Sequence, residues 1–261
     1  MTRVTTTWTT HETTSEALGV LAAEGATGAL SGERGIVYLS AGRVVHVESA
    51  FTPDLGALLT RSGAVPPDGW WDAVDRGGTQ HRVGHRLVDS GRLTAGALEV
   101  CHLGALFDAA YFVLAHDARA QRFRPGAVHW LGAVRSVPVD VVVRESGRRR
   151  ALLDRIWPDP AIDTLPLTRV PGTDTAELPV RRGRTLTQVD GVRTAAQIAS
   201  ALACRTYHTL VELRRLAADG LVRAAPPAAP PVVPGPEPRA VVWDDPDTAL
   251  LRRLRDALEA L

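Results

Sequence analysis

The chain has 261 residues, a formal net charge of +1 at pH 7 and 45% hydrophobic residues, which is typical of one large or two small globular domains. All 30 basic residues are arginine, because the sequence contains no lysine. Schiff-base catalysis and the phosphate loop of nucleotide hydrolases both require a lysine amine, so these two classes of function are excluded.

Two cysteines, Cys101 and Cys204, are too few for a disulfide framework or a zinc ribbon. The N-terminus has no apolar signal segment, and no window of the sequence approaches the roughly 20 apolar residues of a membrane helix. We therefore expect a cytoplasmic protein with no cofactor and no membrane contact, and the sequence identifies no small-molecule substrate.

The first elements of the chain are a short helix and a strand meander. Thr13 and Glu16 have the spacing of a capping box, which predicts a helix over 15–24 that ends at Gly25. Residues 27–49 then contain three apolar, β-branched runs separated by glycine-containing turns. This pattern predicts three antiparallel strands.

Helices dominate the next hundred residues. Thr52 and Pro53 have the form of an N-cap and a first helical residue, and a second helix that carries two tryptophans is expected after Pro66 and Pro67. Apolar spacing predicts further helices over 79–90 and 95–117. After an extended stretch with one or two strands over 120–130, another helix is expected. It begins after the cap Ser136 and stops at Trp157.

Composition divides the rest of the chain. Five prolines between 158 and 179 indicate a connector, and a second proline-rich segment follows residue 225. The predicted organisation is a flexible N-terminus (1–14), a first domain (15–157), a linker (158–177), a second domain (178–225), a proline-rich linker (226–240) and an amphipathic C-terminal helix (241–261).

The second domain has the pattern of a helix-turn-helix. A helix near 180–189 precedes a short helix after Thr194, a tight turn at Cys204, a longer helix and a strand that begins near Gly220. The run DGVRTAAQIASAL with the later LAADGLVR resembles the winged-helix half of many bacterial regulators. The predicted fold class is therefore α+β, with a small N-terminal antiparallel sheet and several helices followed by a winged helix-turn-helix domain.

This resemblance implies contact with duplex DNA, for which the second helix enters the major groove. Five residues at its start would lie nearest the bases: Arg205, Thr206, Tyr207, His208 and Thr209. Seven arginines are candidates for phosphate contacts: Arg181, Arg182, Arg184, Arg193, Arg214, Arg215 and Arg223. The alternative is a protein-binding module, because the helix start contains one arginine and prolines from Pro226 leave no second wing strand.

The first domain contains short runs with glycines at characteristic places: Thr27–Leu30, Gly35–Leu39, Gly42–Val47 and Gly56–Leu58. In these runs, and in the helix that ends near residue 156, it resembles the PatA-like N-terminal domain of bacterial regulators. The family has no catalytic motif, so the resemblance implies a regulatory or interaction domain. A bacterial source also agrees with the abundance of residues that have G+C-rich codons.

Candidate chemistry is sparse. His81 and His85 have the i, i+4 spacing of metal ligands, but they lack the zincin glutamate and a third ligand; Cys101 and His102 with His116 are equally incomplete. His46 is interpreted as a structural histidine on a strand. The sequence therefore predicts no metal site and no enzyme.

Charge is unevenly distributed. Arginines number 8 against 13 acidic residues over 1–118, 10 against 5 over 119–169, and 8 against 3 over 181–225. The basic later segments favour a homodimeric transcription regulator that binds DNA; the alternative is a signalling adaptor that binds protein. Candidate partner-binding residues are Trp70, Trp71, Leu250, Leu254 and Leu258, although Trp70 and Trp71 have packing as their simpler interpretation.

Overall fold

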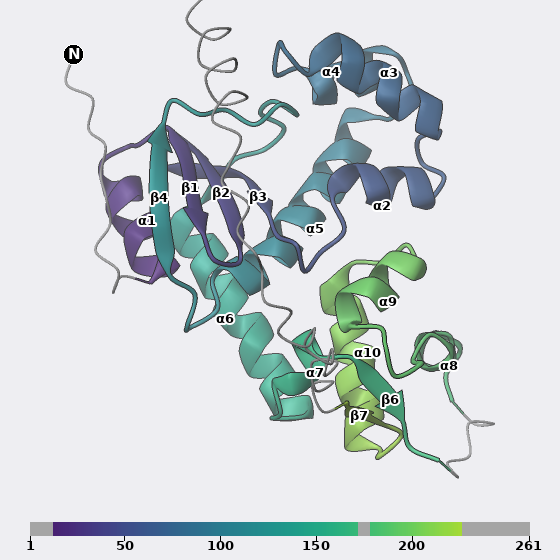
Figure 1. Cartoon of the computed structure of the whole chain (residues 1–261). Helices are drawn as coiled ribbons and strands as arrows, with labels where there is room; N and C mark the ends of the chain where they lie inside the picture. Colours follow the sequence, from purple (N-terminus) through teal and green to yellow (C-terminus); the bar gives the residue numbers. More distant parts are fainter. Residues whose placement is uncertain (1–12, 172–177, 226–261) are drawn as a thin grey trace, which may run out of the picture. The chain divides into compact units, whose positions relative to one another are not determined.

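The computed structural model describes residues 13–171 and 178–225, which belong to one compact unit that reaches Pro226 (Figure 1). Its fold is mixed helix and sheet, as the sequence predicts. The strands are β1 (Gly28–Gly32), β2 (Gly35–Ser40), β3 (Arg43–Glu48), β4 (Ala120–Pro125), β5 (Val137–Pro138), β6 (Leu167–Arg169) and β7 (Val222–Ala224). The helices are α1 (Thr14–Ala23), α2 (Leu55–Arg61), α3 (Pro67–Gly77), α4 (Val83–Asp89), α5 (Ala95–Val113), α6 (Val139–Ile156), α7 (Ala161–Thr164), α8 (Val180–Thr187), α9 (Ala195–Ala201) and α10 (Thr206–Ala218).

The predicted meander forms the centre of a five-stranded antiparallel sheet with the order β4-β1-β2-β3-β5. Tight turns make this order possible. Gly42, in the turn between β2 and β3, has φ +73°, and a Cβ there would lie 2.6 Å from the carbonyl oxygen of Ala22. Only glycine combines this backbone conformation with this close approach.

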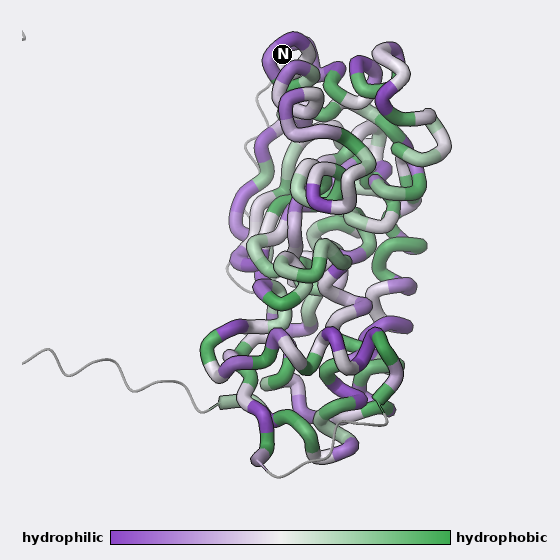
Figure 2. The backbone as a smooth tube through the Cα atoms, turned by 90° about the vertical axis from the view of Figure 1, so that its right-hand side faces the viewer, coloured by the Kyte–Doolittle hydropathy of each residue, from purple (hydrophilic) through white to green (hydrophobic). Residues whose placement is uncertain are grey.

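Three helices cover one face of the sheet (Figure 1). Apolar residues of α1, α5 and α6 pack with alternating residues of the strands in a single buried cluster. The capping box at Thr13 and Glu16 is present, which confirms the predicted start of α1. Hydrophobic and hydrophilic residues alternate along the helices, as expected where one side of each is buried (Figure 2).

A second cluster joins α2, α3, α4 and the first half of α5. The predicted second helix is present as α3, which begins at Pro67 and not after it, and the Trp70 ring is buried against α2. Gly56 of α2 leaves room for this ring, since a Cβ there would collide with the indole. The tryptophan therefore determines how closely the two helices approach.

Several predicted boundaries are wrong for local reasons. Asp54, not Thr52, caps α2 by accepting a hydrogen bond from the backbone N–H of Ala57. Helix α4 starts at Val83 instead of near residue 79, because His81 has φ +54°. Ser136 does not cap α6, since residues 137 and 138 pair with β3 and the Ser136 hydroxyl accepts a hydrogen bond from Arg43 instead.

The two helices predicted for the helix-turn-helix are present as α9 and α10, and Thr194 and Gln197 form the capping box of α9. The strand β7 pairs antiparallel with β6, which precedes all three helices of this region. Among the described residues no strand follows β7, so no β-hairpin wing is seen after α10. The predicted linker is also wrong in part, because residues 161–169 form α7 and β6.

Within the described ranges, one helix, α5, is long and apolar enough to cross a membrane by length and composition. The expectation that no window of the sequence reaches this length was therefore wrong. Of its apolar window, 61% is buried inside the fold, and its buried residues include His102 and Asp108. This burial is that of a core helix.

Candidate functional site

The first residues of α10, the helix predicted to enter the DNA major groove, contact the first predicted domain. The carboxylate of Asp108, on α5, accepts hydrogen bonds from the backbone N–H groups of Thr206 at 2.7 Å and Tyr207 at 2.6 Å. The Thr206 hydroxyl donates to the carbonyl oxygen of Phe51. An acidic residue from another element therefore satisfies the free N–H groups at the start of α10.

Burial raises the pKa of Asp108 to about 6, although the two backbone hydrogen bonds oppose this shift. The positive charges of Arg149 and Arg205 also favour the charged form. At neutral pH the carboxylate is ionised and holds the start of α10 by charge-assisted hydrogen bonds.

The second half of α10 is held by Arg214. Its side chain is 1% exposed and forms two hydrogen bonds with the Asp163 carboxylate of α7, at 2.9 and 2.8 Å. A third guanidinium nitrogen donates to the carbonyl oxygen of Trp157 and lies 3.5 Å from Asp154. The Tyr111 hydroxyl of α5 donates to Asp163 at 2.6 Å. The network links α5, the end of α6, α7 and α10.

One apolar core continues across the predicted boundary at residue 157. Tyr111 and Phe112 of α5 and Leu153 of α6 belong to the same buried cluster as the inward faces of α8, α9 and α10. Gly104 of α5 leaves room for the Arg205 side chain, since a Cβ there would collide with the guanidinium. The helix-turn-helix is therefore packed onto the first predicted domain.

This packing corrects four of the predicted DNA contacts. Thr206, Tyr207 and Thr209 are buried, and Arg149 stacks on the Tyr207 ring at 4.6 Å. Arg214 lies in the ion-pair network instead of on the surface. In this arrangement none of the four can reach a base or a phosphate.

The other predicted contacts divide by their partners. Arg182 pairs with Asp219 and Glu212, Arg193 with Asp190, and Arg215 with Glu212. No acidic partner within the described residues lies in ion-pair range of four guanidinium groups: Arg181, Arg184, Arg205 and Arg223.

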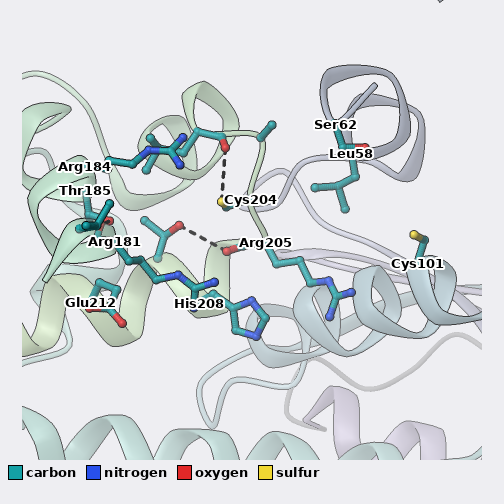
Figure 3. Close-up of a pocket in the computed structure, with 14 residues that line it drawn as sticks. Leu58, Ser62, Cys101, Arg181, Arg184, Thr185, Cys204, Arg205, His208 and Glu212 are labelled. Atoms are coloured by element: carbon teal, nitrogen blue, oxygen red, sulfur yellow. Dashed lines mark hydrogen bonds between the residues drawn. The ribbon is translucent and has the colours of Figure 1, made fainter. Parts of the chain in front are cut away.

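Three of these four arginines border one cavity of about 550 Å³ (Figure 3). Arg181 and Arg184 come from α8, and Arg205 precedes α10. Apolar side chains, among them Leu58 of α2 and Leu202, form part of the wall, and polar side chains such as Ser62, Thr185 and His208 form the rest. The full lining comprises Leu58, Ser62, Cys101, Val180, Arg181, Arg184, Thr185, Leu202, Ala203, Cys204, Arg205, His208, Thr209 and Glu212.

The cavity is electropositive. Its one acidic side chain, Glu212, is already engaged by Arg182 and Arg215. Burial and the charges of Arg205, Arg181 and Arg149 lower the pKa of His208. A cavity with unpaired guanidinium groups and a neutral imidazole is suited to carboxylate or phosphate groups.

The cavity contains a cysteine and a histidine, but they do not form a reactive pair. The Cys204 thiol donates a hydrogen bond to the carbonyl oxygen of Leu202 at 3.3 Å (Figure 3), and no hydrogen bond joins it to His208. Nucleophilic catalysis by cysteine requires such a base within hydrogen-bond reach. The arrangement is suited to binding.

The candidate partner residues fall into three groups. Trp70 is buried and packs edge-to-face on Trp130, so it is a core residue and not a contact surface. Trp71 is 62% exposed and remains a candidate. Leu250, Leu254 and Leu258 lie outside the described residues.

Sequence reasoning missed Leu58, Cys101, Asp108 and Asp163. The first two line the cavity only because two segments about a hundred residues apart are packed together, which no local pattern indicates. Asp108 did carry a signal, since it is a charged residue within the apolar run LFDAAYF. A buried charge requires a partner, and this one has two.

Comparisons of the chain with protein-family models, with curated proteins and with solved structures found no match. The functional argument therefore depends on the geometry of the site.

Proposed function

We propose that this protein is a non-enzymatic signalling adaptor that binds an acidic segment of a partner protein in the cavity between α2, α5, α8 and α10. The observation that carries the proposal is the set of three unpaired arginines around one cavity, Arg181, Arg184 and Arg205. Carboxylates of a partner would supply the missing counter-charges, and its apolar side chains would contact Leu58 and Leu202.

The geometry favours this function over DNA reading. The cavity of about 550 Å³ has the size of a binding site for a few side chains. A recognition helix that enters the major groove must present its N-terminal residues, whereas here they are bonded to Asp108 and Phe51. Duplex recognition by α10 would require these bonds to break.

The two resemblances fit within this proposal. A PatA-like first domain and a winged-helix second domain are both interaction modules, and we propose that they act here as one body in the bacterial cytoplasm. Winged-helix folds do not all bind nucleic acid, and fold alone does not determine function. Homodimer formation remains part of the hypothesis, with Trp71 as an exposed candidate contact.

Binding of a fluorescein-labelled acidic peptide tests the proposal. The probe has about 12 residues, with glutamates interrupted by leucines, and its matched control has glutamine at every glutamate position. We expect the full chain to bind the glutamate peptide at least about tenfold more tightly than the glutamine peptide at moderate salt. This ratio corresponds to about 1.4 kcal/mol of binding free energy. Anisotropy measures both affinities.

Variants of the chain make the result specific. Arg181→Ala with Arg184→Ala should weaken the glutamate peptide at least about tenfold, whereas Arg223→Ala, an exposed arginine on β7, is the matched control. The His208 pKa, followed by NMR, should rise when the acidic peptide binds. Equal affinity for both peptides would contradict the proposal, as would tighter binding of a duplex oligonucleotide at the same salt.

A further inference from the structure

A second site lies apart from the cavity, where three histidines from distant parts of the chain meet. His46 of β3 stacks on His129, which follows β4, with ring centroids 3.8 Å apart. His102 of α5 lies on the His46 ring at 5.5 Å. The side chains are 6%, 3% and 0% exposed for His46, His129 and His102, so all three rings are buried.

One ring nitrogen of the proposed ligands has no hydrogen-bond partner among the described residues. It is Nδ1 of the buried His46. Buried polar atoms without partners are uncommon in folded proteins, and each one requires an explanation. This nitrogen is therefore a free ligand atom beside His129 and Glu48.

Glu48 completes the chemistry of the cluster. Its carboxylate lies 3.0 Å from Nε2 of His129 and accepts a second hydrogen bond from the Tyr38 hydroxyl at 3.3 Å. One ligand atom each of His46, Glu48 and His129 lies within 4.8 Å of the others. Nitrogen and carboxylate ligands at such separations need to move by about 1 Å to surround one ion with bonds near 2.0 Å.

We propose that His46, Glu48 and His129 bind a divalent transition metal of the zinc class. Two imidazoles and a carboxylate form a donor set that suits Zn²⁺, and a fourth position remains open to water. A cavity of about 240 Å³, lined by His46, Glu48 and Ala105 among others, connects the cluster with solvent. The ion would join β3 to the segment after β4.

Metal binding requires two local changes. The stacked rings of His46 and His129 must tilt, because parallel imidazoles do not direct their lone pairs at one point. His129 now accepts a hydrogen bond on Nδ1 from the backbone N–H of Leu131 at 3.2 Å, so its proton is on Nε2. Coordination through Nε2 moves the proton to Nδ1, and the bond to Leu131 is lost.

Zinc titration of the full chain, stripped of metal with a chelator, tests this site. We expect one equivalent of Zn²⁺ by calorimetry, a higher unfolding temperature in its presence, and a shift of the Leu131 amide signal in NMR spectra. Glu48→Gln should weaken binding at least about 100-fold. Because the Glu48 side chain is 37% exposed, this variant carries little risk for folding.

The matched control is a double variant, His81→Gln with His85→Gln, which removes two exposed histidines and should leave the affinity unchanged. His46→Gln should lose binding as Glu48→Gln does, with its fold checked by circular dichroism. Absence of saturable binding at one equivalent would overturn the proposal. So would full affinity in Glu48→Gln, or loss of affinity in the control.

Discussion

Two buried polar clusters of this protein differ in how fully their atoms are partnered. Around Arg214, the Asp163 carboxylate, the Tyr111 hydroxyl and the Trp157 carbonyl all take part in hydrogen bonds. In the cluster of His46, His102 and His129, Nδ1 of His46 has none. The first cluster joins secondary-structure elements, and the second has the composition of a ligand site.

The difference shows how the hydrogen-bond partners of a buried polar group indicate its role. A buried charge is tolerated when its partners are close and well oriented, and it then makes one packing arrangement more favourable than others. A buried imidazole without a partner costs free energy unless something binds it. Low exposure therefore accompanies a structural role around Arg214 and an unoccupied ligand atom at His46.

Loss of Arg214 should have the largest effect on stability. Arg214→Ala leaves Asp163 buried without a cation, and we expect the free energy of unfolding to fall by about 3 to 5 kcal/mol. Urea denaturation measures this change. Arg214→Lys keeps the charge but loses the paired geometry, so its loss should be smaller.

The exposed Arg223 provides the contrast. Arg223→Ala should change the free energy of unfolding by less than about 0.5 kcal/mol, as is usual for surface positions. Equal stability of Arg214→Ala and Arg223→Ala would contradict the structural role assigned to Arg214.

The local elements of the fold were predictable from the sequence, and the assembly was not. The Thr13 and Thr194 capping boxes, the glycine turns of the meander and Pro67 act over a few residues, so their patterns identify α1, β1 to β3, α3 and α9. The pairing of β7 with β6 joins residues about 55 positions apart in the sequence, and the sequence of neither strand indicates which strand it pairs with. The sequence pattern therefore predicted a winged helix, whereas β7 pairs with β6, a strand that precedes the three helices of this region.

The candidate site shows the same limit. The sequence marked the arginines of α8 and Arg205 as basic contacts, but only the packing of α5 against α10 separates them from the buried Arg214. The histidine cluster could not be predicted either, because His46, His102 and His129 are far apart in the sequence and meet only in the folded chain. The i, i+4 spacing that did attract notice, at His81 and His85, lies on the surface.

Asp108 should make stability depend on pH. Its folded-state pKa of about 6 lies above the ordinary value of 3.8, so between these values the folded chain binds a proton that the unfolded chain releases. The stabilising contribution of this proton is complete below pH 4 and is lost as the pH rises through about 6. Asp108→Asn removes the titrating group and therefore this dependence.

Urea denaturation across this pH range provides the measurement. From about pH 7 down to about pH 3, the free energy of unfolding of the native chain should gain about 3 kcal/mol relative to Asp108→Asn. Asp75→Asn, which changes an exposed carboxylate on α3, is the matched control for the slope. A constant difference between the native chain and Asp108→Asn would contradict the raised pKa of Asp108.

A smaller effect is expected at His102. Burial lowers the pKa of His102 to about 4, although a backbone hydrogen bond with Val45 opposes this shift, so its ring is neutral at pH 7.5. Leucine has a similar volume and no polar atom to desolvate, but it cannot replace this hydrogen bond. Because the two effects oppose each other, His102→Leu should change the free energy of unfolding of the metal-free chain by less than about 1 kcal/mol.

This change is smaller than the loss expected for Arg214→Ala, and urea denaturation in the presence of a chelator measures it. His116→Leu is the matched control, because it makes the same substitution at an exposed histidine. A loss of about 3 kcal/mol or more in His102→Leu that the control does not show would mean that the His102 ring contributes as much to stability as Arg214. The contrast between the two polar clusters would then no longer hold.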